Sequence, residues 1–218
     1  MRRVAADPVY FFDSDEIQPA SPYYTSYNWG MAKLFIPVIE GTTRPKRESI
    51  RAAKLVFKVG QEFKDVETML VDPNDFKLPY DGNDDENKDP RYTKITAKAD
   101  GFFIVTPEYN HGYPGSLKRL LDSELENYIH KPVAFAGVSN GLWGGVRAIE
   151  ALVNSVREMG MVATFTDVQF PRVQDLFDDK GELLDKKYIK RVKRTWEELI
   201  WMAKVLKYGR EKIPSLYY

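Results

Sequence analysis

A basic segment at residues 41–47, with the sequence GTTRPKR, has the residue types that bind a phosphate group. It combines a glycine, two threonine hydroxyls and three cations directly before a helical pattern. Backbone N–H groups at a helix start, hydroxyls and guanidinium groups together hold phosphate oxygens. Cations at a helix N-terminus oppose the helix dipole, so a purely structural role is unfavourable. The segment is neither a Walker A loop nor a GxGxxG fingerprint.

Two further loops have residues suited to a planar ring. Residues 106–115, TPEYNHGYPG, mix aromatic rings with amide and backbone donors, which suits the face and edge of a heteroaromatic ring. Pro114-Gly115 is explained as a helix start. Residues 139–145, SNGLWGG, contain three glycines, which let the backbone approach a ligand closely, although glycine turns are common.

The composition excludes several classes of chemistry. There are no cysteines, so disulfides, thiolate nucleophiles and Cys-ligated metals are excluded. The two histidines, His111 and His130, cannot build a His-rich metal site, and we expect no metal. Redox chemistry would therefore need a bound cofactor.

The whole-chain numbers favour one soluble globular domain within 218 residues. The 32 basic residues balance 32 acidic ones, so we expect no nucleic-acid partner. No apolar run of about 18 residues predicts a membrane span, and the N-terminus lacks the apolar core of a signal peptide. We therefore expect a cytoplasmic protein without a membrane partner.

Five apolar runs, at residues 34–39, 66–71, 101–106, 132–138 and 162–168, alternate with helical patterns. This alternation predicts βαβ units around a parallel sheet. Ligands of such sheets bind beyond the strand C-terminal ends, where the winding direction switches. The loops that follow the first, third and fourth runs therefore meet at the expected binding edge. Pro37, which cannot donate to a ladder, should lie near the beginning of a central first strand.

The helical patterns predict which residues face the core. Predicted helices start after residue 47, run over about 92–99, and extend through Glu126 and Met159. The first should bury Ile50, Ala53, Phe57 and Gly60. A long acidic connection before the second, containing residues 81–89, is predicted to be a solvated loop. The last helix carries an apolar stripe that needs a partner surface, formed by Ile189, Val192, Trp196, Leu199, Ala203 and Leu206.

Residues 1–32 show no sustained period and are predicted to be an N-terminal extension, leaving residues 33–218 as the main domain. The extension is rich in aromatic residues, which suggests packing on a neighbouring surface or subunit. A segment with no role in the native protein is the alternative interpretation.

Three segments together resemble the NADPH-dependent FMN reductase family. They are GTTRPKR after the first strand, TPEYNHGYPGSLKRLLD after the third and GVSNGLWGGVRA after the fourth, and the resemblance covers about residues 33–170. It implies a flavodoxin-like α/β fold, a doubly wound sheet of five parallel strands in the order 2-1-3-4-5 with helices on both faces. It also implies an FMN cofactor, with NADPH or NADH as electron donor.

The resemblance assigns site residues by position. Thr42, Arg44 and Arg47 would hold the FMN phosphate. The residues that would line the isoalloxazine ring are Pro107, Glu108, Tyr109 and Asn110, and those near its pyrimidine edge are Ser139, Gly144 and Gly145.

The chain departs from the family pattern at two positions, because Arg119 stands where Asn is common and Asn140 where an aromatic residue is common. Asn140 would change the acceptor pocket, Trp143 could supply the missing aromatic surface, and His111 could steer a substrate or be structural. Arg119 affects a helix contact rather than the flavin site.

The implied function is reduction of a small acceptor, namely a quinone, free flavin, azo compound or metal oxyanion, at the expense of NAD(P)H. The cofactor carries this chemistry, so no catalytic side chain is expected. A flavodoxin-like electron carrier or flavin-dependent regulator, without nicotinamide turnover, is the alternative, and a nucleotide-binding module without redox chemistry ranks third. Because flavin sites in such folds often adjoin a subunit interface, and because the last helix has an apolar stripe, we expect a homodimer or homotetramer.

Overall fold

The computed structural model describes residues 33–78 and 80–217. The chain divides into two units, Met1–Met31 and Ala32–Tyr218. The predicted extension at residues 1–32 lies outside the described residues, and the fold of the second unit follows.

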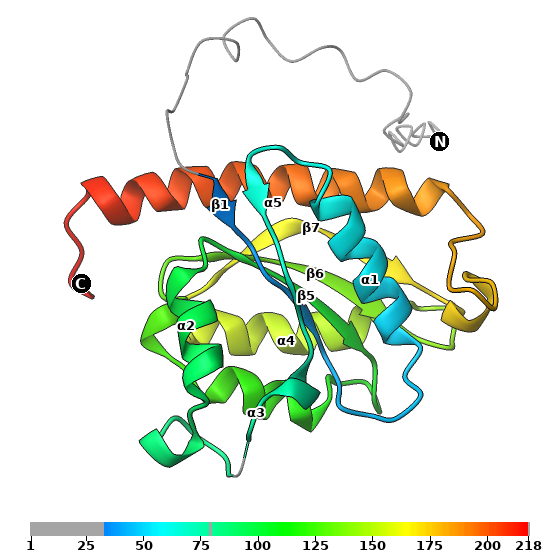
Figure 1. Cartoon of the computed structure of the whole chain (residues 1–218), viewed down its shortest axis with the longest axis horizontal. Helices are drawn as coiled ribbons and strands as arrows, with labels where there is room; N and C mark the ends of the chain where they lie inside the picture. The colour runs from blue at the N-terminus through cyan, green and yellow to red at the C-terminus, as the bar shows by residue number, and fades with distance from the viewer. Residues whose placement is uncertain (1–32, 79, 218) are drawn as a thin grey trace, which may run out of the picture. The chain divides into compact units, whose positions relative to one another are not determined.

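A parallel five-stranded sheet forms the centre of the second unit, with the strand order β4-β2-β5-β6-β7 (Figure 1). Its strands are β2 (Val38–Glu40), β4 (Leu70–Val71), β5 (Phe102–Pro107), β6 (Pro132–Val138) and β7 (Val162–Phe170). Two short strands, β1 (Leu34–Phe35) and β3 (Val66–Glu67), pair in parallel as a separate two-stranded sheet. The predicted flavodoxin-like α/β class is confirmed. The sheet has five parallel strands as predicted, but the first and second predicted strands are each divided in two.

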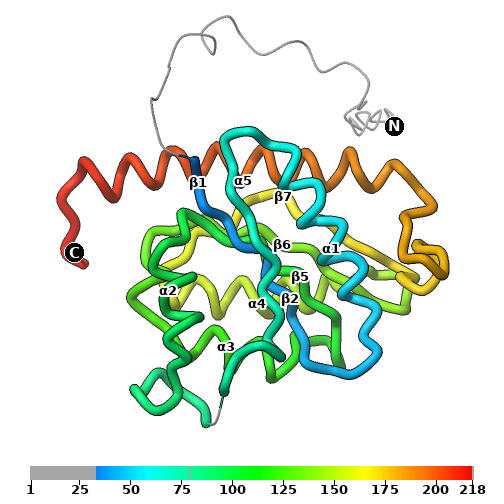
Figure 2. The backbone as a smooth tube through the Cα atoms, viewed as in Figure 1, coloured from blue at the N-terminus to red at the C-terminus, as the bar shows by residue number. Residues whose placement is uncertain are grey.

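Pro37 separates β1 from β2. The Ile36 and Val38 N–H groups still donate to Glu67 and Met69 carbonyls at 2.9 and 2.8 Å, so the pairing continues on that side. On the β5 side Pro37 has no N–H to donate, although its carbonyl accepts a hydrogen bond from Phe103 N at 3.0 Å. The backbone therefore passes from β1 to β2 without a turn (Figure 2), and Pro37 directly precedes the central strand β2.

Helices cover both faces of the sheet (Figure 1). On one face, α1 (Ser49–Gly60) and α5 (Lys187–Lys212) pack on Phe103, Val105 and Ala136. On the other, the buried residues come from α2 (Pro90–Lys98), α3 (Gly115–Asp122) and α4 (Val146–Glu158). Within the described residues, four short 3-10 helices lie in connections: Pro73–Asp75, Asp85–Asn87, Glu126–Tyr128 and Val173–Asp175.

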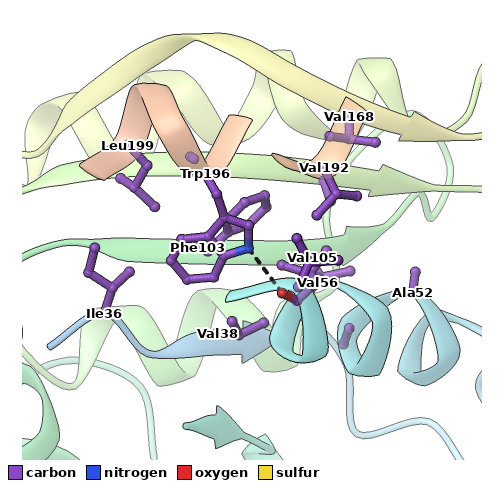
Figure 3. Packing of buried hydrophobic residues seen from close by; sticks show 14 of the residues in the cluster. Ile36, Val38, Ala52, Val56, Phe103, Val105, Val168, Val192, Trp196 and Leu199 are labelled. Atoms are coloured by element: carbon purple, nitrogen blue, oxygen red, sulfur yellow. Dashed lines mark hydrogen bonds between the residues drawn. The ribbon is translucent and has the colours of Figure 1, made fainter. Parts of the chain in front are cut away.

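The last helix buries its apolar stripe against its own chain. Trp196 is fully buried, its ring centroid lies 5.2 Å from that of Phe103, and its Nε1 donates to the Val56 carbonyl at 3.0 Å (Figure 3). Val192, Leu199 and Ala203 are fully buried in the same cluster. The stripe therefore needs no second subunit, and it does not support the predicted homo-oligomer.

Two helix predictions need correction. In α1 the buried residues include Ala52, Val56 and Val59, whereas Ile50 and Phe57 are only partly buried. The helix α3, which follows residues 106–114, ends at Asp122 rather than Glu126. The Ser123 hydroxyl donates to the Leu120 carbonyl at 2.7 Å, which satisfies a terminal acceptor and competes with further helix.

The acidic connection is less solvated than predicted, because Asp89 is buried and caps α2. Its carboxylate accepts hydrogen bonds from the N–H groups of Arg91 and Lys77, both at 3.0 Å. The hydrogen bond to the Arg91 side chain holds the pKa of Asp89 well below its usual range. Arg119 fixes the same connection to α3, through the carbonyl of Tyr80 and an ion pair with Asp81 at 2.9 Å.

Candidate flavin site

Three loops, namely loop one (residues 41–47), loop two (residues 106–115) and loop three (residues 139–145), line one cavity of about 250 Å3 at the C-terminal ends of β2, β5 and β6. This is the edge where the winding direction switches, since the chain passes from β2 outward to β4 and then across to β5. The predicted site residues that line it are Arg44, Arg47, Pro107, Glu108, Tyr109, Ser139 and Asn140. The volume lies just below the range of ~300–1,000 Å3 usual for ligand sites.

Loop one is held against loop two by Thr42. Its side chain is buried, and its Oγ1 lies 3.1 Å from the Tyr109 hydroxyl and accepts a hydrogen bond from Arg44 N at 3.2 Å. Gly41 is required by close packing, since a Cβ there would lie 2.8 Å from the Cα of Thr106. Loops one and two are therefore joined before any ligand binds.

The N-terminus of α1 is open to an anion. The N-cap residue Glu48 makes no side-chain cap and instead pairs with Arg51 at 3.1 Å, and within the described residues the first turn holds no acid. Arg44 and Lys46 line the cavity beside it, and neither pairs with a carboxylate in residues 33–78 or 80–217. Uncapped N–H groups and two unpaired cations favour a bound anion.

Arg47 is engaged by two carboxylates. Its Nε lies 3.2 Å from Glu40 Oε1, and its Nη2 pairs closely with Asp72. Glu40 is fully buried, and burial raises its pKa to about 7, while the Ser49 hydroxyl at 2.7 Å and Arg47 act to lower it.

Loop two turns sharply after Tyr109. The N–H groups of Tyr109 and Gly112 donate to each other's carbonyls at 2.8 and 3.0 Å. Asn110 and His111 form the turn with φ of 51° and 66°, in the left-handed region that few residues other than glycine adopt. Both side chains are exposed, and neither lines the cavity.

The glycines of loop three make their closest contacts with the sheet. Gly145 has φ of 84°, and a Cβ there would lie 2.4 Å from Val138 N. A Cβ on Gly144 would lie 2.6 Å from the Cβ of Gln169. These contacts explain the glycines without a ligand, so their place at a flavin edge stays a prediction. Trp143 lies outside the cavity lining and is 64% exposed, with the Arg147 guanidinium 5.5 Å from its ring centroid.

Sequence reasoning did not single out several residues of the site. Ser49 and Val173 line the cavity, and Arg147 joins Glu108 to Trp143. Ser49 could have been found as a hydroxyl in the first turn of the helix after loop one. Val173 comes from the connection after β7, which carried no recognisable signal.

The donor set fits a phosphorylated planar ligand such as FMN. An uncapped helix with two unpaired cations lies at one end, and residues 107–109 and 138–140 line much of the rest of the cavity. Fold and site together define a flavodoxin-like mononucleotide-binding protein.

The sequence matches the NADPH-dependent FMN reductase family over residues 35–175, and the chain belongs to that family. Membership identifies it as a flavin-dependent oxidoreductase with FMN as cofactor and NAD(P)H as electron donor.

Three individual relatives are also named as reductases. The chain is 32% identical over 179 residues to a Schizosaccharomyces pombe NAD(P)H-dependent FMN reductase, covering 75% of this chain and 87% of the relative. It is 27% identical over 162 residues to a Pseudomonas putida quinone reductase, covering 69% and 85% of the two chains. A Bacillus NADPH azoreductase is 32% identical over 120 residues, which are 53% of this chain and 64% of that protein.

The fold is similar to solved flavoenzymes. The NAD(P)H:(acceptor) oxidoreductase FerB from Paracoccus denitrificans superimposes with a TM-score of 0.64 at 20% identity, covering 79% of this chain and 98% of that one.

Among the described helices, none has the length and apolar character needed to cross a bilayer.

Proposed function

We propose that this protein uses FMN to pass electrons from NAD(P)H to a small acceptor, a quinone, free flavin, azo compound or metal oxyanion. The observation that carries the proposal is the convergence of the three loops on one cavity beside an uncapped, cationic helix start. Bound FMN supplies the electron transfer, and the protein supplies binding and orientation.

In this proposal the first loop holds the phosphate. Arg44, Arg47 and Thr42 would bind it together with N–H groups of α1, and the contact of Thr42 with Tyr109 supports a preformed loop. Pro107, Glu108 and Tyr109 would lie along the ring, with Asn110 at the turn beyond them.

Loop three would hold the opposite edge of the ring. Ser139 lines the cavity, and the tight packing of Gly144 and Gly145 on β6 and β7 supports a rigid backbone there. N–H groups of a rigid loop can stabilise the negative charge that develops on a reduced ring.

The acceptor would bind over the exposed side of the ring. Trp143, with its exposed indole, and Asn140, at the cavity wall, are the residues that would contact it, and His111, in the exposed turn of loop two, would steer it. We expect Trp143→Ala to raise KM for aromatic acceptors several-fold while leaving the FMN content unchanged.

Anaerobic reduction tests the proposal directly. Purified, FMN-loaded protein should bleach on addition of NADPH or NADH and regain its yellow colour when a quinone or azo compound is added. A protein that does not retain FMN would contradict the proposal. Bound FMN that is reduced only by a protein reductase would instead support the electron-carrier alternative.

A further inference from the structure

Glu40 is a buried carboxylate at the end of β2, one residue before loop one. Its Oε1 accepts a hydrogen bond from the Ser49 hydroxyl at 2.7 Å. Its Oε2 is also buried and has no hydrogen-bond partner in the described part of the chain. Glutamate is rarely buried completely unless it is well paired, so Glu40 depends strongly on the few donors that it has.

Two groups that stabilise the Glu40 carboxylate, a hydroxyl and a guanidinium, also face the candidate flavin cavity. Arg47, with its Nε 3.2 Å from Oε1, and Ser49 line that cavity, whereas Glu40 does not. The hydroxyl donor Ser49 and the ion-pair partner Arg47 are therefore shared between the buried carboxylate and whatever anion the cavity holds.

Besides these two groups, the backbone N–H of Gly41 acts to lower the pKa of Glu40, and that N–H also donates to the Val105 carbonyl at 2.7 Å. Arg47 and Asp72, the latter after β4, are the charged groups that act on it, and Asp72 has the same sign as Glu40. From β5 its register neighbour is the apolar Val105, and from α1 it meets Ser49. Burial already raises the pKa of Glu40 to about 7, against the lowering effect of Ser49 and Arg47.

We infer that Glu40 takes up one proton when FMN binds, because the phosphate takes Ser49 and Arg47 as its own donors. The proton comes from solvent and binds a carboxylate oxygen, which converts a buried anion with few partners into a neutral acid. The inference rests on the proposed function, since it places the FMN phosphate in loop one. Glu40 is then a positioning residue, which orients both donors before FMN arrives and releases them afterwards.

This linkage predicts a defined pH dependence. Above pH 7, where free Glu40 is mostly ionised, the Kd for FMN should rise by up to about tenfold per pH unit. Below about pH 6 the residue is already protonated and contributes no dependence. The second ionisation of a phosphate monoester lies near pH 6 and is complete in this upper range, so it does not produce the effect.

Isothermal titration calorimetry of the flavin-free protein with FMN measures the proton directly. Titrations at about pH 8 in two buffers of different ionisation enthalpy should give close to one proton taken up per FMN. Riboflavin, which lacks the phosphate, should give an uptake near zero. At about pH 6 Glu40 is already protonated, so its contribution to the proton uptake should vanish.

Two variants locate the proton. Glu40→Gln keeps the size and an acceptor for Ser49 but cannot titrate, so it should bind FMN without proton uptake and with a Kd that is constant above pH 7. Asp72→Asn, which removes the other carboxylate from Arg47, should keep the uptake. If Glu40→Gln does not fold, infrared difference spectra of wild-type protein with isotope-labelled glutamate test the inference instead. FMN binding should add the band of a protonated glutamate carboxyl group.

The outcomes separate the two proposals. FMN binding at pH 8 without proton uptake, or with undiminished uptake in Glu40→Gln, would overturn the inference and leave the flavin-dependent function intact. Protein that does not bind FMN at all would overturn both.

Discussion

The Glu108 carboxylate binds Arg147 twice and so joins loop two of the site to the start of α4, which follows loop three. Its Oε2 accepts a hydrogen bond from the backbone N–H of Arg147 at 3.3 Å, and its Oε1 lies 3.4 Å from the Arg147 guanidinium. Arg147 is the second residue of α4, so Glu108 acts as an anion at that helix N-terminus from a distant loop.

The backbone contact should matter more than the ion pair. Glu108→Ala removes the group that binds the α4 N-terminus and should cost about 1–2 kcal/mol of unfolding free energy, as loss of a helix cap does. Arg147→Met removes only a 40% exposed ion-pair partner and should cost less than ~1 kcal/mol. Urea denaturation of both variants checks this. A larger loss in Arg147→Met than in Glu108→Ala would contradict it.

Arg44 should contribute to FMN binding through the phosphate alone. It lines the cavity and has no carboxylate partner among the described residues, so Arg44→Ala removes a charge-assisted contact worth about 1.5–3 kcal/mol. The Kd for FMN should rise by about ten- to a hundredfold, and that for riboflavin should not change. Fluorescence titration measures both. Arg157→Ala, at an exposed arginine in the last turn of α4, is the control and should bind FMN normally.

Glu40 should make the stability of the free protein depend on pH. Its pKa is raised from 4.5 to about 7, so its protonated form stabilises the fold below pH 4.5, and this contribution is lost as the pH rises through 7. The total change is at most about 3 kcal/mol. Relative to wild type, Glu40→Gln should therefore gain stability between pH 5 and pH 8 in urea denaturation. Glu62→Gln, at an exposed position after α1, should show no such gain.

Two glycine substitutions should have opposite effects. A Cβ on Gly60 would lie 2.5 Å from the ring of the buried Trp196, so Gly60→Ala should destabilise the protein by about 1–3 kcal/mol through overpacking. Gly209 lies inside α5 with nothing within 4 Å of a Cβ, so Gly209→Ala should stabilise it by about 0.5–1 kcal/mol. Thermal unfolding measures both. Equal effects at the two positions would contradict the prediction that contact with Trp196 destabilises Gly60→Ala.

A homodimer or homotetramer stays a prediction, which now depends on the surface near the flavin site. Leu142 and Trp143 in loop three are 67% and 64% exposed, and a second subunit would cover them. Light scattering at micromolar concentration should give the mass of two or four chains, and Leu142→Glu should reduce it to one. Phe165→Glu, at an exposed residue of β7, is the control and should leave the mass unchanged.

Much of the fold could be predicted because its signals are local. Each strand of the sheet is an apolar run, and the parallel arrangement follows from their alternation with helical patterns. The boundaries were less predictable. The division at Pro37 depends on which side of the strand lacks a donor, and the end of α3 depends on the Ser123 hydroxyl.

The loops that form the candidate site could be predicted from the sequence, but the pairs of residues that meet within it could not. Residue types placed Arg44 and Tyr109 at the binding edge, where the cavity lies. The exposed positions of Asn110 and His111 follow from a left-handed turn that the residue types alone did not indicate.

By itself, the sequence determined the chemistry that is available: cations and hydroxyls before one helix, aromatic residues and glycines in two loops, and no thiol. Only the tertiary structure decided which of these groups pair with one another. It placed Arg47 between Glu40 and Asp72, and Trp196 on α1 rather than on another subunit. The reason is physical, since burial and pairing are set by contacts between residues far apart in the chain, whereas periodicity and composition report only on near neighbours.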